Sequence, residues 1–270
     1  MIARAEIDRT ATKHKVGPIE IEKDYVITWI LYGISKNGDL KRSLAFKGGT
    51  ALKKMYFEKY RFSEDLDFTL LDEKLSDAEI QDLFETSLEI AEEESGIRFE
   101  IDLEKGIEPH ASGSFRFYIN YVAPLQGALG SRYVKVDITR GELLEFELEK
   151  RTVFAEYSDF DEDFKILSYS LSEIVIEKMA ALMGRTIPRD IYDLWYLFEI
   201  EGMDITHHSY EFERKAANKG QDPTQFHEKI EKKEKTFQRD WNASLANQIH
   251  DLPDFKEVMR LLKKHFRKLG

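Results

Sequence analysis

The spacing of apolar residues divides the chain into a first part that mixes strands and helices and a second part that is helical. Strand-like patterns cover four segments: 43–46, 61–71, 115–121 and 133–138. Helical spacing covers five segments: 25–34 with an end near Gly38, 51–60, an acidic segment at 77–94, 171–184 and 188–200. The character changes near Lys165, and charged helix continues to Gly270. We therefore expect an α+β fold with a mixed α/β domain over 1–165 and a helical domain over 166–270.

Composition places the chain among ordinary globular proteins. Hydrophobic residues make up 42% and charged residues 34% of the sequence. No apolar run approaches the roughly 20 residues that a membrane span needs, and the first residues lack the apolar stretch of a secretory signal. The absence of cysteine excludes disulfides and thiolate zinc sites. We expect a cytoplasmic protein with no membrane partner.

Charge is distributed unevenly. The net charge is -11, but 205–270 holds 14 Lys and Arg against 10 Asp and Glu, a balance of about +4, which leaves about -15 for the rest. Residues 260–268 are basic, with apolar residues at helical spacing. They are either a solvated helix face or a contact for the phosphate backbone of RNA or DNA.

Two aspartates mark the first candidate site. On a strand over 61–71, alternate side chains share a face, so Arg61, Ser63, Asp65 and Asp67 point the same way. Carboxylates two residues apart lie about 6–7 Å from each other along a strand. That spacing suits hard cations such as Mg²⁺ or Mn²⁺. A surface strand with two acidic side chains is the alternative.

A glycine turn precedes this strand. Gly48, Gly49 and Thr50 follow a short apolar strand and open a helix. Glycines let backbone N–H groups approach phosphates closely, and a helix N-terminus favours anions. The alternative is an ordinary turn with Thr50 as a helix cap. The segment 133–138 adds Asp137, on the same face as Lys135. Asp137 either completes a three-carboxylate metal site or is a solvent-facing charge at a strand end.

Lys178 lies within the apolar stripe of its predicted helix. Burying an unpaired ammonium is costly, so the lysine needs an anionic partner, such as a triphosphate or a site aspartate, or it extends its head to water. Asp190 and Asp193 lie one turn apart on the next helix. Asp190 also suits the helix start, where its charge interacts with the dipole. Asp193 is bracketed by apolar residues and is harder to explain as a surface residue.

These motifs together resemble the AbiEii-type nucleotidyltransferases, the toxins of abortive-infection, type IV-like toxin–antitoxin systems. The resemblance spans roughly residues 20 to 200 and rests on four motifs: Gly48-Gly49-Thr50-Ala51-Leu52, Arg61-x-Ser63-x-Asp65-x-Asp67, Lys178, and Arg189-Asp190-x-x-Asp193-Leu194. It implies a DNA polymerase beta-like nucleotidyltransferase domain with a mixed sheet, followed by helices.

The resemblance also implies roles for the site residues. Asp65 and Asp67 would bind Mg²⁺ or Mn²⁺, with Asp137 as the third carboxylate. The nucleoside triphosphate would be held by the turn and the residues beside the aspartates: Gly48, Gly49, Thr50, Arg61 and Ser63. The helical domain would contribute Lys178 to steady the phosphates or leaving group and Asp193 as an acid or base, with Asp190 beside it. Related toxins modify RNA, including tRNA acceptor ends, and are restrained by a winged-helix antitoxin.

Two other functions compete with this interpretation. A haloacid-dehalogenase-like phosphatase would use Asp65-x-Asp67 as its nucleophile motif. That motif normally ends an apolar buried strand, whereas 61–64 is polar, and the phosphatase leaves the glycine turn unexplained. A non-catalytic module that binds RNA or a protein would keep the fold without using the aspartates.

Overall fold

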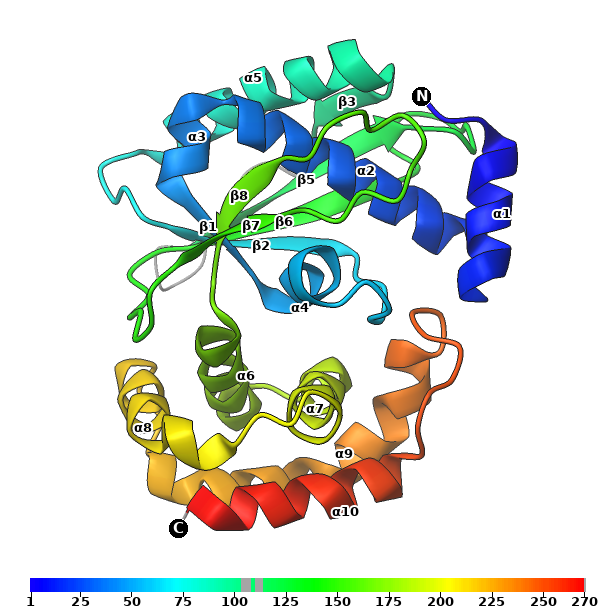
Figure 1. Cartoon of the computed structure of the whole chain (residues 1–270). Helices are drawn as coiled ribbons and strands as arrows, with labels where there is room; N and C mark the ends of the chain where they lie inside the picture. The colour runs from blue at the N-terminus through cyan, green and yellow to red at the C-terminus, as the bar shows by residue number, and fades with distance from the viewer. Residues whose placement is uncertain (103–107, 110–113, 270) are drawn as a thin grey trace. The chain divides into compact units, whose positions relative to one another are not determined.

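The computed structural model describes residues 1–102, 108–109 and 114–269, which form two units (Figure 1). The first unit comprises 1–142 and 148–169, and the second comprises 143–147 and 170–270. In the described part of the chain, we find no helix long and apolar enough to cross a lipid bilayer.

A mixed sheet forms the centre of the first unit. Its strands follow the order β3-β5-β6-β2-β1-β8-β7, and β4 pairs with β5. The pairs β2–β6 and β1–β8 are parallel, and the other pairs are antiparallel. The strands are β1 (Leu44–Lys47), β2 (Asp65–Leu70), β3 (Arg98–Ile101), β4 (Glu108–Pro109), β5 (Phe115–Val122), β6 (Tyr133–Thr139), β7 (Glu149–Thr152) and β8 (Lys165–Ser168).

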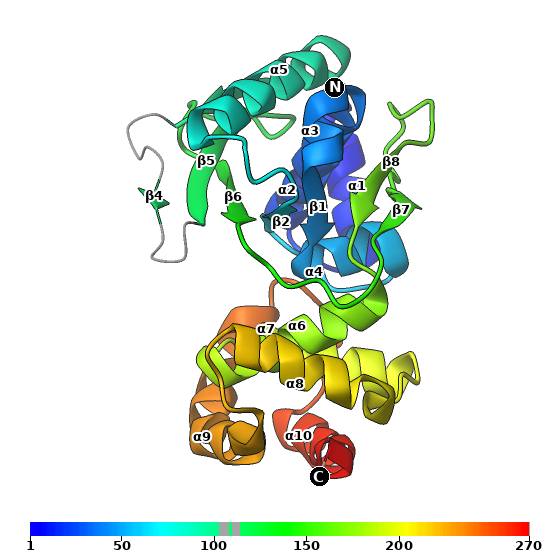
Figure 2. The same ribbon diagram turned by 90° about the vertical axis from the view of Figure 1, so that its left-hand side faces the viewer.

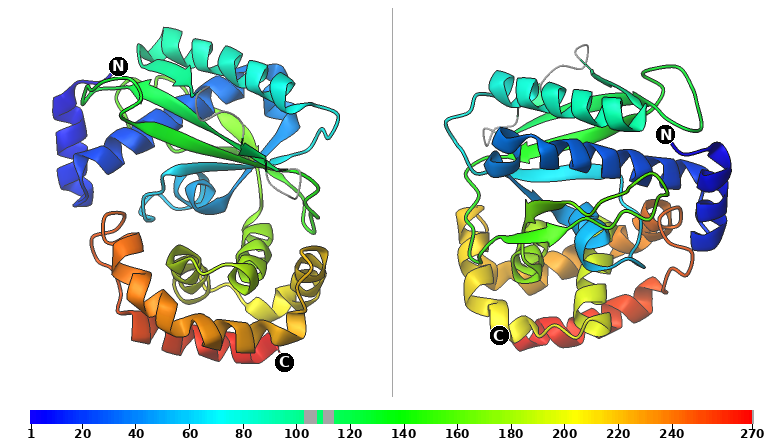
Figure 3. Two further views of the ribbon diagram at one scale, coloured as in Figure 1. Left: turned by 180° about the vertical axis from the view of Figure 1, so that it is seen from behind. Right: turned by 45° about the horizontal axis from the view of Figure 1, so that its top comes forward.

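Helices cover this sheet. They are α1 (Arg4–His14), α2 (Pro18–Lys36), α3 (Gly38–Ser43), α4 (Gly48–Ala51), the π-helix η1 (Leu52–Tyr56) and α5 (Asp77–Ser95). Helices α2 and α5 run side by side over one face (Figures 1 and 3). Their close approach requires Gly33, because a β-carbon there would lie 2.1 Å from the Ser87 carbonyl oxygen. Most residues of α2 are buried, including the charged Glu22 and Asp24.

The core of the first unit orients β2. Leu66 and Phe68 are buried, and Phe68 lies 5.2 Å from Phe46 of β1 and 6.1 Å from Phe84 of α5, measured between ring centroids. Because side chains alternate along a strand, burial of these two residues turns Asp65 and Asp67 to the opposite face. The hydrophobic pattern of β2 thus sets the direction of its carboxylates.

The second unit is helical (Figure 2). Its elements are α6 (Leu171–Gly184), α7 (Pro188–Trp195), the π-helix η2 (Tyr196–Ile200), η3 (Ile205–His208), α8 (Ser209–Asn218), η4 (Pro223–Gln225), α9 (Phe226–Leu245), α10 (Phe255–Phe266) and η5 (Arg267–Leu269). The fully buried Glu173 carboxylate accepts hydrogen bonds from the Glu145 and Phe146 N–H groups at 2.8 and 2.9 Å. Lys215 donates to Glu173 at 2.7 Å and to the Leu143 carbonyl at 2.6 Å. These bonds attach 143–147 to the second unit.

The predicted α+β class, with a mixed sheet followed by helices, is confirmed. Three element predictions are wrong in detail. The strand predicted over 61–71 begins only at Asp65, and the helix predicted over 51–60 ends at Tyr56 as a π-helix. The segment predicted as one helix over 188–200 is α7 followed by the π-helix η2.

Candidate active site

Gly48 brings the backbone close to a carboxylate of the neighbouring strand. It follows β1, whose last residue Lys47 lies opposite Asp67 in the antiparallel β1–β2 pair. Its φ of +78° favours glycine. A β-carbon at this position would also lie 2.5 Å from Asp67 Oδ2. A side chain at Gly48 would therefore displace the Asp67 carboxylate.

Gly49 makes room for a buried arginine. A β-carbon there would lie 2.4 Å from Arg61 Nη2, and Arg61 is only 2% exposed. The guanidinium donates to the Phe62 carbonyl oxygen at 3.2 Å and lies over the Tyr60 ring. Arg61 thus sits beside the glycine turn, but from the loop that precedes β2. The prediction that Arg61 and Ser63 belong to the strand is wrong, because this packing holds their segment outside the ladder.

Thr50 connects the turn to the start of β2. Its hydroxyl is hydrogen-bonded to Ser63 Oγ at 2.8 Å and to the Asp65 carbonyl oxygen at 2.5 Å. The alternative of Thr50 as a helix cap is wrong, since the N-cap of α4 is Lys47 and makes no side-chain capping bond. The structure therefore brings Thr50, Ser63 and Arg61 to the two glycines.

Three carboxylates share one face of the sheet. Asp67 lies opposite Asp137 in the parallel β2–β6 pair, and Asp65 lies opposite Lys135. The Lys135 ammonium lies 3.1 Å from Asp65 Oδ2 and 2.9 Å from Asp137 Oδ2. On the other side, Arg116 of β5 bonds Asp137 Oδ1 through Nε at 2.6 Å. Asp137 is thus part of a charged cluster with cations on two sides.

The electrostatics of this cluster reflect crowded negative charge. Burial, followed by the neighbouring carboxylates of Asp65 and Asp137, raises the pKa of Asp67 to about 6. Burial alone lowers the pKa of Lys135, but the carboxylates of Asp65 and Asp137 outweigh it and raise that pKa. The negative charge of these carboxylates therefore favours a cation between Asp65 and Asp137.

The donor set fits a hard divalent cation. Carboxylate oxygens are the ligands that Mg²⁺ and Mn²⁺ prefer, and the Lys135 ammonium marks a point where positive charge is stabilised between Asp65 and Asp137. As the side chains of the described residues stand, no three or more acidic or histidine residues surround one point. A metal would have to displace the Lys135 ammonium from its place.

Sequence reasoning missed Arg116, although a signal for it was present. Phe115, Phe117 and Ile119 are buried in β5, so alternation assigns Arg116 to the opposite face. The register that places it beside Asp137 is set by strand pairing and cannot be read from the local pattern.

Lys178 has the anionic partners that its buried position requires. It is 5% exposed, and its ammonium lies 2.5 Å from Asp193 Oδ2 and 3.1 Å from Asp190 Oδ1. The anionic partners of Lys178 are therefore the two aspartates of the next helix, and the alternative of a lysine extended into water is wrong.

Asp190 is shared between two cations. Arg185 donates to its carboxylate at 2.9 Å through Nε. Burial favours the neutral acid, but Lys178 and Arg185 outweigh it and hold the pKa of Asp190 below its usual value. The second unit therefore carries its own buried cluster of one lysine and two aspartates, with an arginine at its edge.

Solved structures share this fold. JHP933 from Helicobacter pylori matches with a TM-score of 0.60 and 16% identity, over 94% of this chain and 93% of that chain. MenT4, a nucleotidyltransferase toxin from Mycobacterium tuberculosis H37Rv, matches with a TM-score of 0.52 and 23% identity, over 74% of this chain and 65% of that chain. These identities support the fold alone, and a comparison with curated proteins finds no match.

The family is shown by the sequence itself. Residues 29–264 match the family model described as nucleotidyl transferase AbiEii toxin, type IV TA system. The match covers far more than half of the chain and includes all the motif residues above. Because this match identifies a family of nucleotidyltransferases, the alternative of a haloacid-dehalogenase-like phosphatase is excluded. The chain belongs to the AbiEii family of nucleotidyltransferase toxins of type IV toxin–antitoxin systems.

Proposed function

We propose that this toxin uses a divalent cation to transfer a nucleotide from a nucleoside triphosphate to RNA, with tRNA as the favoured acceptor. The observation that carries the proposal is the register of β2 and β6, which sets Asp65, Asp67 and Asp137 on one face beside the Gly48-Gly49 turn. The choice of tRNA and of a winged-helix antitoxin as the restraining partner rests on the family resemblance.

The reaction joins an acceptor hydroxyl oxygen to the α-phosphorus of the triphosphate. The bond between the α-phosphorus and the oxygen that bridges to the β-phosphate breaks, and pyrophosphate leaves while the acceptor loses its hydroxyl proton. Mg²⁺ or Mn²⁺ held by Asp65, Asp67 and Asp137 would stabilise the developing charge on the reacting oxygens. The protein's own task is then positioning and charge stabilisation.

Residues of the first unit suit the binding of the triphosphate. Gly48 and Gly49 have no side chains of their own, which favours the approach of phosphate oxygens to their N–H groups. Thr50 and Ser63 hold the turn against β2, and the Arg61 guanidinium supplies positive charge next to Gly49.

The roles proposed for residues of the second unit rest on the family resemblance alone. Lys178 would stabilise charge on the phosphates or the leaving group. Its ammonium lies 2.5 Å from Asp193 Oδ2, and this close pairing sets its position. Asp193 is proposed as an acid or base, and Asp190 as the residue that shares the lysine charge with it.

Label transfer tests this function. The protein is incubated with each α-labelled nucleoside triphosphate, total RNA, and Mg²⁺ or Mn²⁺. We expect label in RNA, and a loss of at least about 100-fold in Asp67→Ala, because removing one group that stabilises transition-state charge typically costs that much. Asp82→Ala, at an exposed position of α5, serves as the matched control and should transfer normally. Tight RNA binding without label in any acceptor would instead identify a non-catalytic module.

A further inference from the structure

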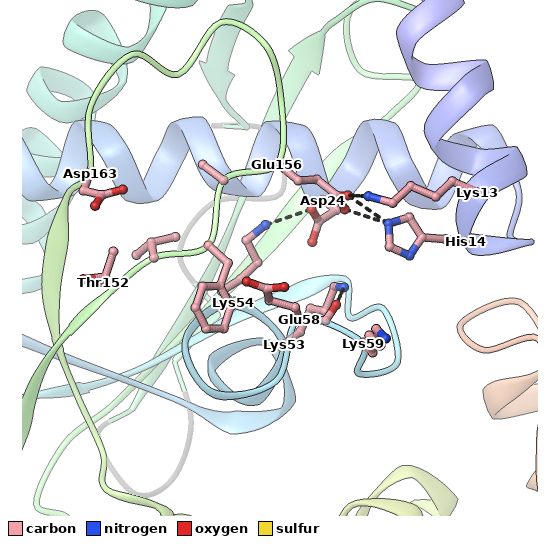
Figure 4. A pocket seen from close by; sticks show the side chains of 13 residues that line it. Lys13, His14, Asp24, Lys53, Lys54, Glu58, Lys59, Thr152, Glu156 and Asp163 are labelled. Atoms are coloured by element: carbon pink, nitrogen blue, oxygen red, sulfur yellow. Dashed lines mark hydrogen bonds and ion pairs between the residues drawn. The ribbon is translucent and has the colours of Figure 1, made fainter.

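The first unit contains a cavity separate from the carboxylate cluster. It has a volume of about 390 Å³ and lies among the end of α1, the π-helix η1 and the segment that follows β7 (Figure 4). Five basic residues and one aromatic residue of its lining carry the argument: Lys13, His14, Lys53, Lys54, Lys59 and Phe154. Neither the three clustered aspartates nor the glycine turn contributes to its walls.

Some of the positive charge in this cavity is already neutralised. The buried Lys54 ammonium lies 2.8 Å from Asp24 Oδ2, which also accepts from the Tyr157 hydroxyl at 2.7 Å. Lys13 and His14 converge on Glu156, as Figure 4 shows. These three basic groups have carboxylate partners in the protein.

Lys53 differs from its neighbours. It is 4% exposed, and its ammonium donates to the Glu58 carbonyl oxygen at 2.5 Å and lies 4.5 Å from the centroid of the Phe62 ring. Among the residues that the structure describes, no carboxylate pairs with it within 4.0 Å. Burial, only partly offset by Asp24, lowers the pKa of Lys53. An ammonium has three donors, and a buried one without a counter-charge is costly.

The rest of the lining combines charges of both signs with one aromatic ring, and its remaining carboxylates are those of Glu58 and Asp163. Lys59 is exposed and adds a second cation to the lining. The half-buried Phe154 ring offers a flat apolar surface, and its segment is fixed because Phe154 N–H donates to the Lys54 carbonyl oxygen at 2.6 Å. A volume of about 390 Å³ lies within the range of small-molecule sites.

We propose that this cavity binds the phosphoryl group of a small ligand, with the Lys53 ammonium as its central contact and Lys59 as a second one. Pyrophosphate and a nucleoside monophosphate both carry this chemistry. In the second case the Phe154 ring stacks on the base, since every base has a face for an aromatic side chain. The proposal is independent of the transfer reaction.

Isothermal titration of the whole chain with pyrophosphate and with AMP, in EDTA, tests the site. We expect one site per chain. Lys53→Met should weaken binding about tenfold or more, because a charge-assisted hydrogen bond is lost. Lys59→Gln, at an exposed position that folding tolerates, should weaken it about threefold, a typical exposed ion pair. Phe154→Ala should weaken AMP but leave pyrophosphate unchanged. Lys74→Gln, on an exposed loop, is the control and should bind normally.

Three results would overturn the proposal. One is that neither probe binds. Another is equal binding by the wild type, Lys53→Met and Lys59→Gln. The third is binding that Ser63→Ala abolishes and Lys53→Met leaves intact, which would place the anion at the candidate active site. None of these outcomes depends on transfer activity, so the proposed function is judged separately.

Discussion

At the scale of single residues, the two glycines of the turn have different neighbours, but each is required for the same physical reason. Each leaves room for a charged group that a β-carbon would displace, the Asp67 carboxylate at Gly48 and the Arg61 guanidinium at Gly49. The two glycines are thus required by side chains that follow 12 to 19 residues later in the sequence. Only Gly48 also has a left-handed φ.

Gly48→Ala should therefore lose transfer activity by more than its cost in stability explains. The left-handed φ alone costs about 1–2 kcal/mol in a non-glycine residue, and the added β-carbon also displaces Asp67 Oδ2. Gly96 is the matched control, since its φ is +70° with nothing within 4 Å of a β-carbon. Urea unfolding should show similar losses for the two alanine variants, whereas label transfer should fall only in Gly48→Ala. Equal activity of both would contradict the role assigned to the close approach.

At the scale of elements, periodicity predicts the segments whose burial is regular. β1, β5, β6, α5 and α6 begin and end within two residues of the predicted bounds because one face of each packs on the core. The alternation of β2 continues back through Arg61 and Ser63, so the local pattern predicts a strand where the structure has a loop. There, the packing of Arg61 against Gly49 outweighs the local pattern. Short or polar strands such as β3, β7 and β8 carry too few residues for periodicity to mark them.

The contacts that attach α1 to the segment after β7 make the stability of the fold depend on pH. Burial would raise the pKa of Glu156, but hydrogen bonds from His14 and Lys13 prevail and lower it from 4.5 to about 2. A carboxyl group with a lower pKa in the folded state stabilises the fold above its unfolded pKa, and this contribution is lost as the pH falls. The window therefore runs from about pH 4.5 down to about pH 2.

Glu156→Gln should accordingly unfold more easily than the wild type at pH 7, with a difference that shrinks below pH 4.5. Urea unfolding of both proteins at a series of pH values measures it. Glu162→Gln is the control, because Glu162 also pairs with a lysine but lies on the surface, where such a pair contributes little. A difference between Glu156→Gln and the wild type that stays constant down to pH 2.5 would contradict the assignment.

At the scale of the whole molecule, the candidate site is only partly visible in the sequence. The strand pattern singles out Asp65 and Asp67, and the helical pattern singles out Lys178, Asp190 and Asp193. The family resemblance then adds the roles of these residues. Which groups meet is decided by pairings between distant strands. The β2–β6 register sets Asp67 opposite Asp137, and the β5–β6 register adds Arg116. Local patterns contain no information on either register, because strand alternation fixes the face of a side chain and not its neighbour on the next strand.

The Lys135 ammonium links metal binding to the stability of the whole chain. It neutralises part of the charge between Asp65 and Asp137, so it competes with any divalent cation for that place. Lys135→Gln should lower the melting temperature in EDTA, since the carboxylates then repel one another without a counter-charge. In Mg²⁺ or Mn²⁺ the same variant should gain more in melting temperature than the wild type, because a ligand that binds only the folded state stabilises it more when it binds more tightly. Lys150→Gln, at an exposed position of β7, should respond to metal as the wild type does. If Lys135→Gln gains no more from the metal than the wild type, then the ammonium does not occupy the cation's position, and the metal site proposed for Asp65, Asp67 and Asp137 loses its main physical support.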